Sequence, residues 1–200
     1  MKLNFRHLGI KIISAAIAAV GLAVLVSASA GPANAAAKPA ASAKAKSAGP
    51  WAGKTVWVVD VNSNEDYNNK LLEAVEKLLP QAAPGVKAKR VKTGDKNPFF
   101  LLKETDRPAA VIAGTGVCAS TTPQVVNYAA SALKLGIPTV IVHVPEFRSL
   151  REENAKTYRV PDLHYYEVAN GAPETVAEAE ILAKAAMPEL VKALTEQIEK

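Results

Sequence analysis

Cysteine is nearly absent from this sequence, since Cys118 is the only one among 200 residues. No intramolecular disulfide can form, so the fold must be held by packing and hydrogen bonds. Histidine is scarce as well, and His143 and His164 stand far from each other and from Cys118 along the chain. The ligand spacing of metal-binding motifs is therefore missing. We expect neither a metal ion nor a cofactor.

Acidic residues are absent from the first 50 positions, which hold six lysines and arginines. A basic start is followed by an apolar run at 12–26 and then by small residues up to Ala33-Asn34-Ala35. This order is typical of a secretory signal peptide, here cut before Ala36. The alternative is an uncleaved anchor, because small residues could extend a run that is shorter than the roughly 20 residues needed to span a bilayer. We expect a secreted or periplasmic protein with no stable membrane insertion once the signal is removed.

Large apolar side chains are absent from residues 36–50, a stretch of alanine, lysine, serine, glycine and proline. Such a segment buries too little surface to offset the entropy lost on ordering it. We therefore expect three parts: a signal peptide at 1–35, a flexible linker at 36–50 and one domain at 51–200.

An excess of positive charge is absent from the expected domain. The whole chain has 24 lysines and arginines against 19 aspartates and glutamates. Without the six basic residues of the first 50 positions, 18 basic residues face 19 acidic ones, a net charge of −1. A domain so close to neutral offers no electrostatic surface for nucleic acid. Nucleic acid is excluded as a partner, and a small-molecule ligand or substrate is expected.

What the domain does have is an alternation of strand-like and helix-like segments. Runs rich in β-branched residues predict strands at 55–61, 86–91, 109–113 and 139–144, and an alternating run at 163–168 predicts an edge strand. Helical spacing predicts helices from Ser63 or Asn64 to Pro80, from Thr122 to Gly136, and over 174–199, the last kinked or divided by Pro188. The sequence therefore predicts one doubly wound, flavodoxin-like α/β domain of three layers, with a mostly parallel five-stranded sheet in the order 2-1-3-4-5.

The expected topology places a candidate binding site at one edge of the sheet. In such sheets ligands bind beyond the carboxyl ends of the strands, where the strand order reverses. That point lies between the first and third expected strands, so Asp60 and Asn62 should lie opposite Gly114, Thr115 and Gly116. We expect these five residues to help bind the small molecule. For Asp60 the alternative is to cap the helix that follows.

Cys118 stands in the stretch Gly114-Thr-Gly-Val-Cys-Ala-Ser-Thr-Thr122, which leads from a strand into a helix start. Backbone amides at a helix N-terminus stabilise a thiolate and lower its pKa. Ser120, Thr121 and Thr122 add hydroxyl donors for a substrate oxyanion. The alternative is a small, inert cysteine packed under the turn.

His143, near the carboxyl end of the fourth expected strand, is the candidate base for the thiol, as in Cys–His pairs. An inward-facing strand histidine with one satisfied nitrogen is the other interpretation. Glu146 and Arg148, in the loop that follows, could bind a charged substrate or form an ion pair.

The stretch from Gly116 to Thr122 resembles the motif of the UGSC family, named for a selenocysteine-or-cysteine, Gly, Ser, Cys sequence. The resemblance runs from Lys54 into the final helix. The further similar segments are 109–113, 135–142, 146–147, 161–163 and 193–195, together with Asp60 and Asn62.

The resemblance places Cys118 at the selenocysteine-or-cysteine position and Ser120 at the motif serine, which implies redox or nucleophilic work for Cys118. Ala119 replaces the motif glycine and Thr121 the second cysteine, so no disulfide can form within the motif. The family's His-Pro after the last strand reads Ala169-Asn170. We expect an exported UGSC-like protein with a thiol-dependent activity on a small molecule. The alternative is a non-catalytic ligand-binding module of the cell envelope that uses the same crevice.

The signal-peptide interpretation predicts an exported product that begins at Ala36, or else near Gly31, because the small residues there suit signal peptidase. N-terminal sequencing of the exported protein measures this directly. An intact Met1 on a membrane-bound product would contradict it.

Overall fold

The five predicted strands form one sheet in the computed structural model, which describes residues 50–61, 67–93, 96–169 and 172–199. The strands are β1 (Thr55–Asp60), β2 (Lys87–Lys92), β3 (Ala110–Gly116), β4 (Thr139–His143) and β5 (His164–Glu167). Their order is β2-β1-β3-β4-β5, and every pairing is parallel. The predicted doubly wound α/β fold and its strand order are confirmed. The predicted signal peptide at 1–35, residues 36–49 and the predicted helix start at Ser63 or Asn64 lie outside the described residues.

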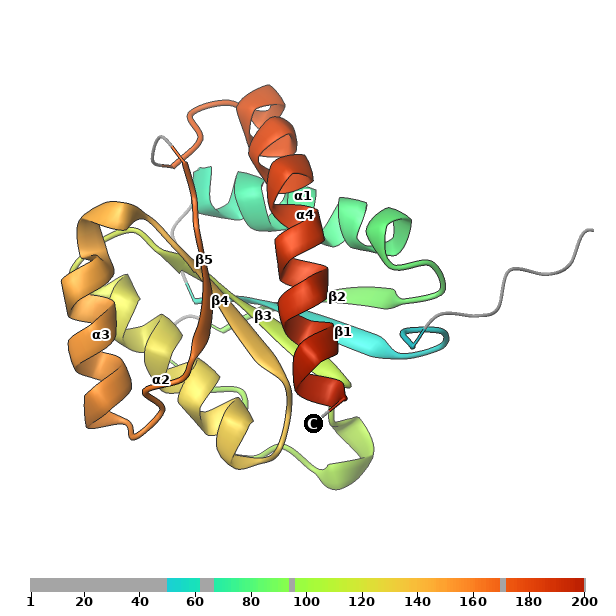
Figure 1. Ribbon diagram of the computed structural model, residues 1–200, viewed down its shortest axis with the longest axis horizontal. Coiled ribbons are helices and arrows are strands. Elements are labelled where there is room, and N and C mark those ends of the chain that lie inside the picture. The colour runs from blue at the N-terminus through green and yellow to red at the C-terminus, as the bar shows by residue number, and fades with distance from the viewer. Residues whose placement is uncertain (1–49, 62–66, 94–95, 170–171, 200) are drawn as a thin grey trace, which may run out of the picture. The chain divides into compact units, whose positions relative to one another are not determined.

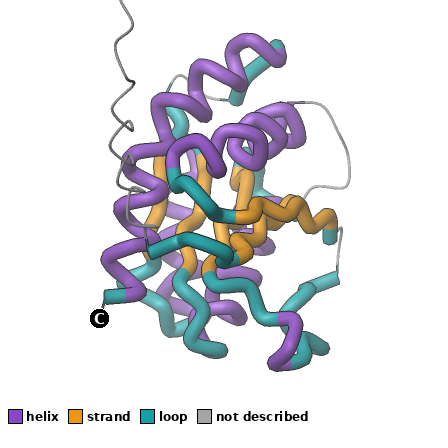
Figure 2. The backbone as a smooth tube through the Cα atoms, turned by 90° about the vertical axis from the view of Figure 1, so that its right-hand side faces the viewer, coloured by secondary structure: helices purple, strands orange, loops and turns teal. Residues whose placement is uncertain are grey.

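Helices cover both faces of the sheet, because the inner strands are apolar on both sides (Figures 1 and 2). Helices α1 (Tyr67–Ala82) and α4 (Val176–Ile198) pack on one face, where Leu72 and Leu190 are buried together with Val58. Helices α2 (Thr121–Lys134) and α3 (Arg148–Thr157) pack on the other face, around Ile141 and Val126. Two short 3-10 turns, η1 (Glu104–Asp106) and η2 (Pro145–Phe147), complete the fold. None of the described helices is long and apolar enough to cross a membrane.

Of the two outcomes predicted for Pro188, a kink or a division of the final helix, the structure excludes the division. Helix α4 runs from Val176 to Ile198 with Pro188 inside it. Buried side chains on both sides of the proline, Met187 and Leu190 among them, pack into the core. A capping box at Thr175 and Glu178 holds the N-terminus of the helix. Packing along the whole length offsets the single hydrogen bond that a proline removes. Pro80 likewise lies inside α1, which ends two residues later at Ala82.

Trp51 fastens the start of the described chain to the domain. Its side chain is buried in the core on the α1–α4 face, and its Nε1 donates a hydrogen bond to Thr195 Oγ1 at 3.1 Å. Just after it, the Gly53 amide donates to the Gly85 carbonyl at 2.8 Å. Gly85 has a positive φ of 88°, and a Cβ there would lie 3.0 Å from Ala52 Cα, so glycine suits both the conformation and the close approach.

We expect Trp51, and not the linker before it, to contribute to stability. Trp51→Ala should lower the free energy of unfolding by about 3–5 kcal/mol, because it empties a core position. Deleting residues 36–49 should change it by less than about 0.5 kcal/mol, as surface changes do. Denaturant melts of the two variants measure both values. A large loss on deleting 36–49 would show that the linker packs on the domain.

Candidate functional site

The parallel register brings most of the predicted site residues to one edge of the sheet. Asp60 at the end of β1 pairs with Gly114 of β3, and Gly116 at the end of β3 pairs with His143 of β4. The register of β3 against β4 shifts between Ala113 and Gly116, where β3 leaves the regular ladder. Asn62, also predicted for this site, lies outside the described residues.

The two glycines of this edge allow close packing. A Cβ at Gly114 would lie 3.2 Å from Val142 Cβ, and one at Gly116 would lie 3.1 Å from Thr122 Oγ1 and 3.3 Å from His143 Cβ. These distances are too short for a side chain without movement of its neighbours. The glycines therefore let β3 approach β4 and the start of α2.

The Thr121 hydroxyl organises the turn that follows. Its Oγ1 accepts hydrogen bonds from the Val117 amide at 3.1 Å and from the Cys118 amide at 3.2 Å. Both lone pairs of the oxygen are then used, and the hydroxyl proton is left to donate. Cys118 Sγ lies 3.1 Å from Thr121 Oγ1. We infer that Thr121 donates to the sulfur, an arrangement that favours the thiolate.

Two more donors face the same sulfur. Ser120 Oγ lies 3.1 Å from Cys118 Sγ, and the Thr121 amide donates to Sγ at 3.4 Å. Ser120 itself, the residue before α2, makes no side-chain capping bond. The sulfur of Cys118 thus takes the position of a capping acceptor at the N-terminus of α2.

These contacts lower the pKa of the Cys118 thiol. Partial burial acts to raise it, but the hydrogen bonds from Ser120 and Thr121 together outweigh burial and bring the pKa down to about 7. A thiol with this pKa is about half ionised at neutral pH. Cys118 is only partly buried, so the nucleophilic form is both populated and accessible.

His143 is directed to partners other than the thiol. Its ring is fully buried, and Nδ1 lies 2.9 Å from the Val144 carbonyl, which can only accept, so we place the proton on Nδ1. Nε2 lies 3.6 Å from Glu167 Oε1. Burial lowers the pKa of His143, which keeps the ring neutral near pH 7. The hydrogen bonds described for Cys118 involve Ser120 and Thr121, and the role of His143 as a base stays a prediction.

A cluster of charged side chains beside His143, formed by Arg148, Arg151 and Glu167, was not predicted from the sequence. Arg148 donates from Nε to Glu167 Oε1 at 2.7 Å and from Nη2 to Oε2, and this hydrogen bonding is the main reason that the pKa of Glu167 is lowered. The guanidinium of Arg151 stacks 3.5 Å from the centre of the Tyr165 ring, which in turn contacts His143. The sequence suggested an ion pair of Arg148 with Glu146, whereas in the structure Arg148 pairs with Glu167. Glu167 ends β5, a strand that was predicted from its alternating pattern.

Asp60 is buried at the same edge and has a charged partner. Its Oδ2 lies 2.8 Å from Arg90 Nη2, and the Asp60 side chain is fully buried. A buried carboxylate needs such a partner. The structure therefore gives the predicted ligand-orienting residue a role in holding Arg90 of the neighbouring strand.

Three buried polar atoms at this edge of the sheet have no hydrogen-bond partner among the described residues. They are Thr115 Oγ1, Thr122 Oγ1 and His143 Nε2, all at the carboxyl ends of β3 and β4 or the start of α2. Unpartnered buried polar atoms are uncommon, and they mark places where a polar ligand group can be held. The described residues contain no group of three histidine, cysteine or acidic side chains that could hold a metal ion.

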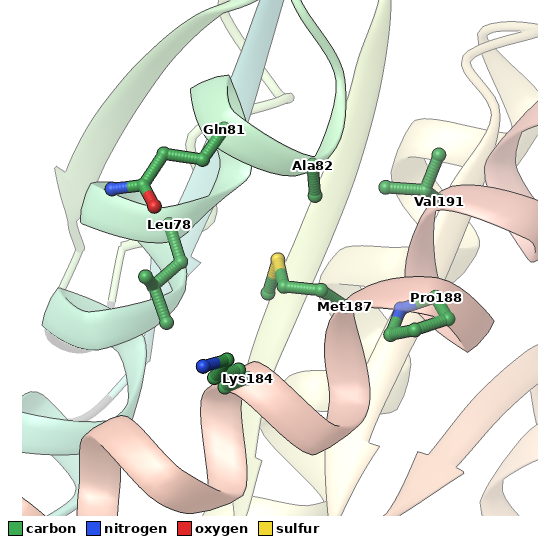
Figure 3. A pocket seen from close by; sticks show the side chains of 7 residues that line it. All are labelled: Leu78, Gln81, Ala82, Lys184, Met187, Pro188 and Val191. Atoms are coloured by element: carbon green, nitrogen blue, oxygen red, sulfur yellow. The ribbon is translucent and has the colours of Figure 1, made fainter.

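A separate groove lies between α1 and α4, with a volume of about 430 Å³ (Figure 3). Leu78, Met187 and the stem of Lys184 line it. None of the residues predicted for the site is among its lining residues, and it adds no nucleophile or acid–base group to the chemistry of Cys118.

A model of the UGSC family matches residues 29–196 of the chain. A comparison with curated proteins finds no match. Similar solved structures include a diflavin flavoprotein from Nostoc sp., 17% identical, with a TM-score of 0.47, covering 73% of this chain and 96% of that one. A flavodoxin from the domain Archaea is 13% identical, with a TM-score of 0.36, covering 68% and 98%. An azoreductase from Bacillus anthracis is 12% identical, with a TM-score of 0.39, covering 72% and 99%. The fold assignment rests on the strand order described above.

Replacing Thr121 should raise the pKa of the Cys118 thiol from about 7 toward the usual value of roughly 8.5. Thr121→Val removes the hydroxyl donor to Sγ and leaves the Val117 and Cys118 amides without their acceptor. It should therefore also lower the free energy of unfolding by about 1–3 kcal/mol. Iodoacetamide labelling rates across pH give the thiol pKa, and denaturant melts give the stability.

Ser120→Ala is the matched control for this pair of effects. It also removes a donor to the sulfur and should raise the thiol pKa. Because no backbone amide loses its acceptor, the free energy of unfolding should stay nearly unchanged. A labelling midpoint that stays near pH 7 in both variants would show that the hydroxyls do not set the thiol pKa.

Proposed function

The chain belongs to the UGSC family, and from that premise we propose that it is an exported protein whose Cys118 thiolate performs nucleophilic or redox chemistry on a small molecule. The observation that carries the proposal is the set of donors around Cys118 Sγ: two hydroxyls at 3.1 Å and one backbone amide at 3.4 Å. An inert, packed cysteine has no need of donors that stabilise its charged form.

The same hydroxyls suit a reaction at sulfur. While the thiolate is free, Ser120 and Thr121 donate to its negative charge. When the sulfur forms a bond to an electrophilic atom of the substrate, that charge leaves it. The hydroxyl of Ser120, which unlike that of Thr121 is not held by two backbone amides, can then turn to a substrate oxygen on which charge develops. The hydroxyls of Thr115 and Thr122, both buried without a hydrogen-bond partner among the described residues, supply further polar atoms for positioning a small polar substrate.

The absence of a second cysteine limits the redox reactions that Cys118 can perform without another molecule. In relatives the resemblance implies a second cysteine where this chain has Thr121. Cys118 is the only cysteine, so a disulfide formed here must be resolved by a thiol from another molecule. Thr121 supports the chemistry as a hydrogen-bond donor, and a thiol-containing substrate or partner would supply the second sulfur.

Export is part of the proposal because of the N-terminal pattern: a basic start, an apolar run at 12–26 and the small residues before Ala36. The domain at 51–200 has a net charge of −1, so it lacks the excess of positive charge that is typical of nucleic-acid-binding domains. After cleavage the protein would work in the secreted or periplasmic space.

A second candidate function is a non-catalytic ligand-binding module in the same crevice. The observation that favours it is the set of unpartnered buried polar atoms on Thr115, Thr122 and His143, which can hold a ligand whether or not Cys118 reacts. On this hypothesis the thiol would be one contact among several.

Replacing Cys118 separates the two functions. Cys118→Ser keeps the shape of the side chain and removes a good nucleophile, so on the catalytic proposal it abolishes thiol-dependent turnover and leaves the melting temperature nearly unchanged. On the packing alternative the same change costs about 1–3 kcal/mol if the new hydroxyl is unsatisfied. Thermal melts of both proteins, together with iodoacetamide labelling of the native thiol, measure the difference. A native thiol that stays unlabelled until the protein unfolds would falsify the catalytic assignment.

A further inference from the structure

The turn at residues 98–101, between β2 and β3, displays two adjacent apolar side chains. Phe100 is 73% exposed and Leu101 is 93% exposed, the two highest values among the large apolar residues of the described chain. The turn lies at the lower margin of the ribbon in Figure 1, in light green. Two adjacent large apolar side chains with this exposure form a small apolar patch, which a binding partner would shield from water.

The turn is well packed against the domain, so the exposure of Phe100 and Leu101 does not result from a loosely held loop. Phe99, the residue before the exposed pair, is buried against Trp57 with a distance of 6.0 Å between ring centres. Asn97 accepts a hydrogen bond from the Phe99 amide at 3.0 Å and donates one to Ser131 Oγ of α2 at 2.9 Å. With Phe99 pointing in and Asn97 tied to α2, the backbone presents Phe100 and Leu101 to solvent.

Positive charge is concentrated around this turn. Residues 87–107 contain seven lysines and arginines and three acidic residues, a net charge of +4, although one of the seven, Arg90, is paired with the buried Asp60. Because residues 51–200 carry −1, the rest of the domain carries −5. Lys96 and Lys103 flank the turn and are exposed. Lys89 of the edge strand β2 lies 5.6 Å from the same Trp57 ring that Phe99 contacts, which places Lys89 on the same side of the domain as the turn.

We propose that the apolar tip (Phe100 and Leu101) and the lysines around it form a docking surface for an anionic lipid membrane. A two-residue tip on a tight turn can enter the headgroup region of a bilayer, where no matching pocket is needed. Lysines around it can rest their aliphatic stems on apolar surface and reach lipid phosphates with their ammonium groups. A protein partner would need a pocket shaped to the tip and a broad contact area around it. The proposal stands on this surface alone and does not depend on the chemistry of Cys118.

Vesicle sedimentation of the exported chain tests the proposal. The probes are vesicles of phosphatidylglycerol and phosphatidylcholine in equal parts, and vesicles of phosphatidylcholine alone. We expect binding to the anionic vesicles that weakens at high salt, and much weaker binding to the zwitterionic ones. The double variant Phe100→Ser and Leu101→Ser, in the same N-terminal background, should reduce partitioning to anionic vesicles about tenfold or more.

The matched control is the double variant Val176→Ser and Ile181→Ser, which removes two apolar side chains of similar exposure, 61% and 68%, from α4. It should leave partitioning unchanged within about twofold. Phe100→Trp adds a direct readout, since its fluorescence should shift to the blue only with anionic vesicles. Equal partitioning of the tip variant and the control, or equal binding to both kinds of vesicle, would overturn the proposal. So would self-association of the protein that the tip variant abolishes while vesicle binding is absent.

Discussion

The hydroxyl of Thr121 is the contact on which the Cys118 turn depends. The chain leaves β3 after Gly116 and must bring two consecutive amides, those of Val117 and Cys118, away from the strand ladder. Both donate to Thr121 Oγ1, at 3.1 and 3.2 Å. Because the oxygen then has no lone pair left, its proton faces Cys118 Sγ. A backbone requirement of the turn therefore sets the polarity of the Thr121 hydrogen bond to the sulfur. Together with the hydrogen bond from Ser120, it lowers the pKa of the thiol.

This coupling gives a physical meaning to the way the motif departs from the family pattern. The UGSC resemblance implies a cysteine at the position of Thr121, and sulfur is a weak acceptor for two amides. An oxygen at this position accepts both amides well and still donates to Cys118. With threonine at this position, the chain has a hydroxyl donor beside Cys118 and no second thiol in the motif. A single thiolate with firm hydrogen-bond support is suited to attack on a substrate or on a disulfide of another molecule, where no internal partner competes for it.

The strands of the sheet could be predicted from the sequence because each strand is a short run whose residue types favour β structure. Runs such as 55–60 and 139–143 are β-branched and buried on both faces, and their alternation with helices leaves few topologies. Helix α3 was missed because, of its ten residues, only Arg151 and Ala155 are buried, so it has almost no apolar periodicity to detect. The ion pairs Asp60–Arg90 and Arg148–Glu167 were not predicted either. They depend on which residues the strand register brings opposite each other, and register follows from tertiary packing.

The central strand β3 connects the two surfaces for which functions are proposed. The connection that enters β3 carries the apolar tip at Phe100 and Leu101, and the turn that leaves it carries Cys118. All seven residues of β3 are buried, and the strand pairs with β1 on one side and β4 on the other. Such a strand is the least deformable part of an α/β domain. The tip is tied to α2 through Asn97 and Ser131, and the thiol lies at the other end of the same helix. A membrane bound by the tip would therefore hold the Cys118 turn in one orientation to the lipid surface, and would decide from which side a substrate approaches.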